Sequence, residues 1–174
     1  VREGRSVWVV PDAEYGSELI YKYIPLDEEF SGTLRAVWPQ RLTAAVRELS
    51  RALRSREFGN LLHIQMERVI ASGPVFLAEQ AEAAWLHDAD LLRSISGGEY
   101  RRVTAIHSGL TDTGISTASV SLSGEEVPDA MWALRSGNSA RCELTATTTS
   151  GAAVLVWEEG REPVLTVNCK VVDL

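Results

Sequence analysis

Four residues in the middle of the chain carry side chains suited to acid–base chemistry: His63, Glu67, His107 and Asp112. His107 alternates with apolar residues such as Ala105, so we expect its imidazole on the apolar face of a strand, where it could act as a general base. Asp112 follows in the adjoining turn and could orient that imidazole, while His63 or Glu67 on another strand could complete an acid–base pair. The alternative is a histidine that is simply hydrogen-bonded in the core.

A second candidate group consists of Arg47, Arg51 and Arg54, which recur at helical spacing and therefore share one helix face. The surrounding stretch, 41–57, holds five arginines against two glutamates in an otherwise acidic protein. This face could bind a protein partner or an anionic ligand such as a carrier phosphate. Alternatively, it is a solvated surface whose arginines pair with the chain's own acids.

The adjacent His87 and Asp88 resemble the metal-binding dipeptide of HD-type phosphohydrolases. Those enzymes are all-helical, whereas the residues that could complete a ligand set here, such as His63, fall in or beside predicted strands. We therefore expect no metal, and a helix on which His87, Asp88 and Asp90 face solvent.

Several established catalytic motifs are missing from the sequence. It contains no GxSxG elbow, no GxxxxGK[ST] phosphate loop, no GxGxxG turn, no HExxH pair and no EF-hand loop. We therefore predict a site that uses no cofactor.

The elements that must position these residues follow from hydrophobic periodicity. Alternation predicts strands over 6–10, 18–24, 62–70, 102–108, 115–122, 140–147, 152–157 and 164–172. Helical spacing predicts helices over 39–57, 72–95 and 127–135. Both cysteines, Cys142 and Cys169, lie on predicted strands and are expected to point inward as reduced thiols, with a disulfide between neighbouring strands as the alternative.

This order of elements indicates an α+β fold rather than a doubly wound parallel sheet. We predict one domain over 1–174, with a curved antiparallel sheet and two long helices packed on one face. Hot-dog and cone-shaped barrel folds share that plan, and sheets of this kind often leave a cavity at one end.

The charge and hydropathy of the chain limit its partners. A formal net charge of -7 and a pI near 5.0 argue against nucleic acid, because neutralising phosphates needs a basic surface. No apolar stretch is long enough for a membrane helix, and no signal peptide is apparent, which predicts a cytoplasmic protein that does not bind membranes. A homo-oligomer is compatible with the sequence.

Two functions are compatible with these features. The first is a small-molecule-binding protein or cofactor-free enzyme of the isomerase, dehydratase, cyclase or thioesterase type, with a pocket between sheet and helices. The alternative is a non-catalytic accessory subunit that binds a protein partner through the arginine-rich helix at 39–57.

Overall fold

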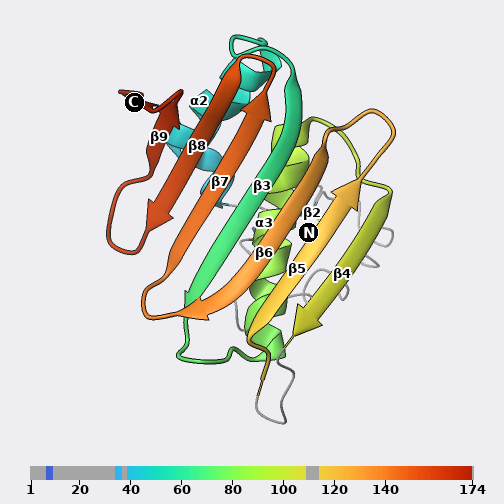
Figure 1. Ribbon diagram of the computed structural model, residues 1–174, viewed down its shortest axis with the longest axis vertical. Coiled ribbons are helices and arrows are strands. Elements are labelled where there is room, and N and C mark those ends of the chain that lie inside the picture. The colour runs from blue at the N-terminus through green and yellow to red at the C-terminus, as the bar shows by residue number, and fades with distance from the viewer. Residues whose placement is uncertain (1–6, 10–33, 37–38, 109–113, 174) are drawn as a thin grey trace.

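The computed structural model describes residues 7–9, 34–36, 39–108 and 114–173 (Figure 1). The helical elements are η1 (Pro39–Leu42), α2 (Ala44–Arg54) and α3 (Ala78–Ser96). The strands are β1 (Val7–Val9), β2 (Leu34–Ala36), β3 (Leu61–Ala71), β4 (Arg102–Ser108), β5 (Thr117–Ser123), β6 (Asp129–Gly137), β7 (Arg141–Thr148), β8 (Gly151–Glu158), β9 (Val164–Val167) and β10 (Lys170–Val171).

Eight of these strands form one sheet in the order β10-β9-β8-β7-β3-β6-β5-β4. Neighbouring strands are antiparallel except β3 and β6, which run parallel at the centre. Helices α2 and α3 both lie behind this sheet on a single face, α2 against β8 and β9 and α3 against β3 and β6 (Figure 1). The fold is therefore α+β, with a mostly antiparallel sheet and two helices on one face, as predicted.

The core fills the space between the sheet and the helices. Helix α2 buries an apolar stripe at helical spacing, and the central strands bury alternate residues. Figure 1 shows that the opposite, outer face of the sheet carries neither helix. The largest fully buried side chains are Trp132, Phe76, Leu49, Ile64, Met66, Leu91, Leu92, Leu134, Leu144, Leu155, Leu165 and Val46.

The sheet is open, so the hot-dog-like and cone-barrel-like plans are wrong. Its outermost strands, β4 and β10, each pair with only one strand in the described part of the chain. The helices lie flat on one face and the sheet does not close around either of them (Figure 1).

The helix predicted over 127–135 is instead strand β6. Ala130, Trp132 and Leu134 are buried and alternate with more exposed neighbours, which is a strand pattern. The stretch contains good helix formers such as Ala133 and Met131, but pairing with β3 on one side and β5 on the other decides its conformation.

The ends of the sequence also depart from the prediction. Strand β1 pairs in parallel with β2, and the strand predicted over 18–24 lies outside the described residues. The strand predicted over 164–172 is divided into β9 and β10 by a tight turn at Asn168 and Cys169, whose φ angles are 48° and 65°. Both cysteines are free, but only Cys142 is buried, because Cys169 lies in that turn.

Within the described residues, no helix is both long enough and apolar enough to cross a membrane.

Candidate functional site

The structure places the predicted acid–base residues on opposite faces of the sheet. His107 on β4 pairs with Ala118, on the face that the helices cover, as the alternation predicts. All seven residues of β4 are nevertheless exposed, because this strand is the edge of the sheet. His63 and Glu67 lie on β3 with their side chains on the outer face, next to buried Ile64.

These residues are therefore not brought together. Strands β3 and β4 are separated by β6 and β5, so they lie about 14 Å apart across the sheet. The register also places His107 level with Arg68, about 17 Å along β3 from His63, and the two imidazoles face opposite ways. His63 and Glu67 share a face but are four residues apart, roughly 13 Å along the strand. Glu67 instead accepts a hydrogen bond from Arg135. Asp112 lies outside the described residues.

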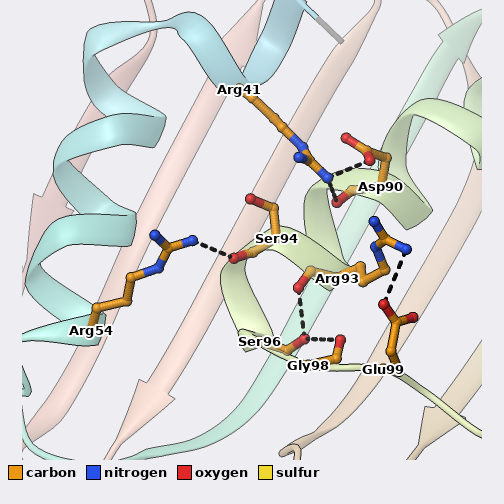
Figure 2. Close-up of polar contacts among 8 residues, drawn as sticks. All are labelled: Arg41, Arg54, Asp90, Arg93, Ser94, Ser96, Gly98 and Glu99. Carbon is orange, nitrogen blue, oxygen red and sulfur yellow. Dashed lines mark hydrogen bonds and ion pairs between the residues drawn. The ribbon is translucent and has the colours of Figure 1, made fainter. Parts of the chain in front are cut away.

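The arginines of α2 lie on the exposed face of the helix, as predicted. Arg51 pairs with Glu48 at 2.6 Å and with Glu57 at 2.9 Å, so part of this positive surface is neutralised by the chain's own acids. Arg54 donates to the carbonyl of Ser94 on α3 at 3.4 Å (Figure 2). Arg47 is exposed.

The main polar site that sequence analysis missed lies beneath α3. Asp88 is completely buried and accepts three hydrogen bonds from the sheet. Arg68 on β3 donates Nε to Oδ2 at 2.6 Å and Nη2 to Oδ1 at 2.5 Å, and Trp132 on β6 donates Nε1 to Oδ2 at 2.7 Å. We call Arg68, Asp88 and Trp132 the carboxylate clamp. The expectation that Asp88 faces solvent is wrong.

Aromatic and sulfur groups surround the clamp. Trp85, one turn before Asp88, meets the ring of Trp132 edge to face, with centroids 5.2 Å apart. Cys142 lies opposite Arg68 on β7, and burial raises the pKa of its thiol to about 12. A thiol with so high a pKa stays protonated at neutral pH and does not serve as a nucleophile.

His87 precedes the clamp on α3 and is half-buried. Burial lowers the pKa of its imidazole, and the positive charge of Arg68 lowers it further, while the carboxylates of Asp88 and Asp90 act in the opposite direction. The imidazole is therefore mainly neutral at neutral pH. A neutral, partly accessible imidazole can accept a proton from a reacting group.

A second polar contact lies two residues further along α3, where Arg41 of η1 reaches Asp90 (Figure 2). Arg41 bonds to both the carboxylate and the backbone carbonyl of Asp90, the latter at 3.2 Å. Burial raises the pKa of the Asp90 carboxyl, although Arg41 opposes this shift. Two buried atoms here, Arg41 Nε and Asp90 Oδ2, have no hydrogen-bond partner among the described residues.

The same close-up shows how the end of α3 is fixed. Arg93 pairs with Glu99 at 3.1 Å, and Ser96 donates to the carbonyl of Arg93 at 3.1 Å (Figure 2). Gly97 then ends the helix with a φ of 79°, a conformation that side chains with a Cβ seldom adopt.

Two hollows occur among the described residues away from the clamp. One, of about 330 Å³, is lined by Gly97, Gly98, Glu99, Arg101, Glu125, Glu126 and Val127. The other, of about 170 Å³, lies on the outer face and is lined by Glu67, Val69, Arg135, Arg141 and Glu143. In the described part of the chain, no group of three or more His, Cys, Asp or Glu side chains is placed to hold a metal ion.

The environment of His87 predicts a pH dependence of stability. Because burial lowers the pKa of its imidazole from the ordinary 6.5, the unfolded chain binds this proton more tightly than the folded protein. The free energy of unfolding should therefore decrease as the pH falls below 6.5 toward the lowered folded value. Urea unfolding measured across this pH range should show a shallower decrease in the free energy of unfolding for His87→Gln than for the wild type. Equal slopes would contradict the prediction.

The sequence matches no protein-family model and no curated protein, but the fold matches solved structures. A dehydrogenase from Chromobacterium violaceum matches with a TM-score of 0.66 at 19% identity, over 94% of this chain and 49% of that one. The myo-inositol dehydrogenase from Corynebacterium glutamicum ATCC 13032 gives 0.62 at 11% identity, over 96% and 61%. The WlbA dehydrogenase from Chromobacterium violaceum, in complex with NADH and UDP-GlcNAcA, gives 0.63 at 17% identity, over 88% and 49%.

These matches correct the functional prediction. The structures that share the fold are dehydrogenases, which are redox enzymes, so the prediction of a cofactor-free isomerase, dehydratase, cyclase or thioesterase is wrong. The chain spans about half to three fifths of the length of these dehydrogenases. Its fold is therefore one that forms part of these dehydrogenases.

Proposed function

We propose that this chain, as a single domain, is the substrate-binding half of an NAD(P)-dependent oxidoreductase that acts on a hydroxylated small molecule. The observation that carries the proposal is a half-buried imidazole, that of His87, kept mainly neutral on a fold shared with dehydrogenases. Oxidation of an alcohol needs a hydride acceptor and a base, and a neutral imidazole is a suitable base.

The residues of this chain do not fit the nicotinamide cofactor itself. The sequence has no GxGxxG turn, and no described strand leads through a glycine-rich turn into a helix of the kind that cradles a dinucleotide's phosphates. The cofactor, which accepts the hydride, would therefore be held by a nucleotide-binding domain outside this sequence.

The contribution of this chain is proton transfer and recognition of the substrate. His87 accepts the hydroxyl proton as the carbon–hydrogen bond breaks, which leaves a carbonyl product. Asp90 lies three residues further on, so the two side chains share one face of α3. The unpartnered donor at Arg41 Nε and the unpartnered acceptor at Asp90 Oδ2 are suited to a substrate hydroxyl, which can accept one hydrogen bond and donate another.

The test uses the natural protein that contains this sequence, purified with any further domain or subunit it carries. We expect the tryptophan fluorescence of this protein to be quenched when NADH or NADPH binds. We also expect the protein to reduce NAD⁺ or NADP⁺ when it is given at least one member of a panel of polyols, sugars and sugar acids. Failure to bind either nucleotide would overturn the proposed function.

We further propose that the outer face of the sheet binds a second copy of the chain. Across seven strands this face presents a row without charge: Thr104, Ser121, Met131, Gln65, Thr145, Val154 and Thr166. An eight-stranded sheet of this length offers on the order of 800 Å² per partner, which is the size of a standard interface. Charged residues flank this row, but they are paired within the chain: Arg141 Nη2 lies 2.7 Å from Glu143 Oε2. Across a two-fold contact such a neutral pair can lie against the same pair of the second copy.

This interface predicts that one charge at its centre separates the copies. Met131→Arg should convert a dimer to a monomer in native mass spectrometry, because a two-fold contact would place two like charges in one buried row. The control is Arg47→Gln, which also changes the charge by one unit, but on α2 behind the sheet, and should leave the dimer intact. A monomeric wild-type protein, or a dimer that persists in Met131→Arg, would contradict the prediction.

A further inference from the structure

The carboxylate clamp is an unusual way to hold a helix on a sheet. Burying a carboxylate and a guanidinium is costly, and a well-packed apolar pair of similar volume is often at least as stable. Asp88 is nonetheless fully buried, and only 21% of the Arg68 side chain is exposed. Stability alone therefore does not explain why this ion pair is buried.

The position of the clamp along α3 suggests that reason. The buried residues of this helix are Asp88, Leu91, Leu92 and Ile95, so its buried apolar anchors all lie in the C-terminal part. Before Asp88, residues such as Ala81, Ala84 and Trp85 are only partly buried. Asp88 is therefore the first fully buried attachment of α3 to the sheet, and it comes directly after His87.

The geometry of the clamp makes this attachment directional. Arg68 and Trp132 project from two adjacent parallel strands, β3 and β6, and both donate to the same carboxylate. Two bonds from the guanidinium define the carboxylate plane, and the indole N–H adds a third bond, from the neighbouring strand. Such an arrangement resists both rotation of α3 about its axis and sliding along the strands.

We propose that Arg68, Asp88 and Trp132 hold the His87-bearing turn of α3 in a fixed orientation, so that all three are positioning residues for His87. This inference rests on the proposed function for its consequence in catalysis, but the positioning itself is measured without catalysis. Beyond fixing the turn, the clamp places a balanced pair of charges beside the imidazole.

The charged groups that act on His87 come from two elements among the described residues: Asp88 and Asp90 on α3, and Arg68 on β3. Asp90 in turn is paired with Arg41. Removing the charge of Arg68 or of Asp88 therefore leaves the other charge without its counter-ion. Asp88→Asn leaves the cation of Arg68 and should lower the pKa of His87, whereas Arg68→Gln leaves the anion of Asp88 and should raise it.

The experiment is an NMR titration of the histidine imidazoles in the intact protein, with the His87 signal assigned by its loss in His87→Gln. We expect midpoints that move in opposite directions in Asp88→Asn and Arg68→Gln. Movement in the same direction would mean that both variants merely loosen the fold, and unchanged midpoints would mean that the clamp does not act on His87. Either result overturns the proposal.

Trp132→Phe supplies a second measurement if a charge variant fails to fold, because it removes the N–H donor to Asp88 and keeps an aromatic ring in place of the larger buried indole. Loss of a hydrogen bond to a charged group should speed amide hydrogen exchange in 78–88 by roughly tenfold or more. Exchange in the part of α3 after residue 90 should change less. Uniform acceleration along α3, or none, would overturn the proposal.

Failure of the proposed function would look different. If nucleotide binding is absent, the oxidoreductase assignment falls, and if His87→Gln turns over normally, the assignment of His87 as the base falls. In either case the titration and exchange results still decide whether the clamp positions His87. Conversely, if the protein is an active oxidoreductase but the clamp variants leave the His87 midpoint unchanged, the proposed function stands and the positioning role of the clamp is wrong.

Discussion

His87→Gln should lower the turnover of the oxidoreductase by roughly 10² to 10⁴-fold, the range typical of losing a general base. Glutamine keeps a polar side chain of comparable length but cannot accept the hydroxyl proton at neutral pH. The measurement is steady-state formation of the reduced nicotinamide by the intact protein, with the substrate identified from the panel. Nucleotide affinity should change little, because we propose that a separate nucleotide-binding domain holds the cofactor.

The matched control is His107→Gln on β4. His107 lies at the exposed edge of the sheet, three strands away from β3, and nothing in its position connects it with His87. Turnover should therefore remain near that of the wild type. A protein that loses activity with His107→Gln and keeps it with His87→Gln would show that the base had been assigned to the wrong histidine.

The fold class was predictable from the sequence because periodicity is a local property. Ala140 to Thr147 alternate cleanly, and β7 follows that pattern closely. The long helix after Gly73 was equally clear. Strand β6 was not, since its alternating Ala130, Trp132 and Leu134 sit among helix formers and only its pairing with two neighbours distinguishes strand from helix.

The sequence contains a pattern from which the clamp could have been predicted. Asp88 falls in the helical row of Trp85, Leu92 and Ile95, and Arg68 falls in the strand row of Ile64 and Met66. A charged residue inside each of two predicted buried rows indicates an ion pair between the elements. What the sequence could not supply is the register that places these two rows opposite each other.

The acid–base set built on His107 failed for a related reason. Alternation correctly placed His107 on the same face as Val103, but a shared face does not guarantee burial. The strand order puts β4 at the edge of the sheet, and Val103 itself is 58% exposed. Which strand becomes an edge is decided by topology, which single-strand patterns do not encode.

Arg68→Met should lower the free energy of unfolding by about 3–5 kcal/mol, the usual cost of leaving one half of a buried ion pair without its partner. Asp88 would keep only the indole N–H of Trp132 and would remain beneath α3 with no compensating charge. Methionine fills a similar volume, so the loss comes from electrostatics rather than from a cavity. Urea unfolding at neutral pH measures it.

The double variant Arg68→Met with Asp88→Leu separates the cost of stranding a charge from the value of the pair itself. Its free energy of unfolding should return to within about 1–3 kcal/mol of the wild type, because both charges and their desolvation costs are removed together while the indole N–H of Trp132 loses its acceptor. The non-additivity would establish that the pair is coupled. If the double variant were as unstable as the sum of its single variants, the two charges would not be coupled, and the cost of a stranded charge would not explain the effect of either single variant.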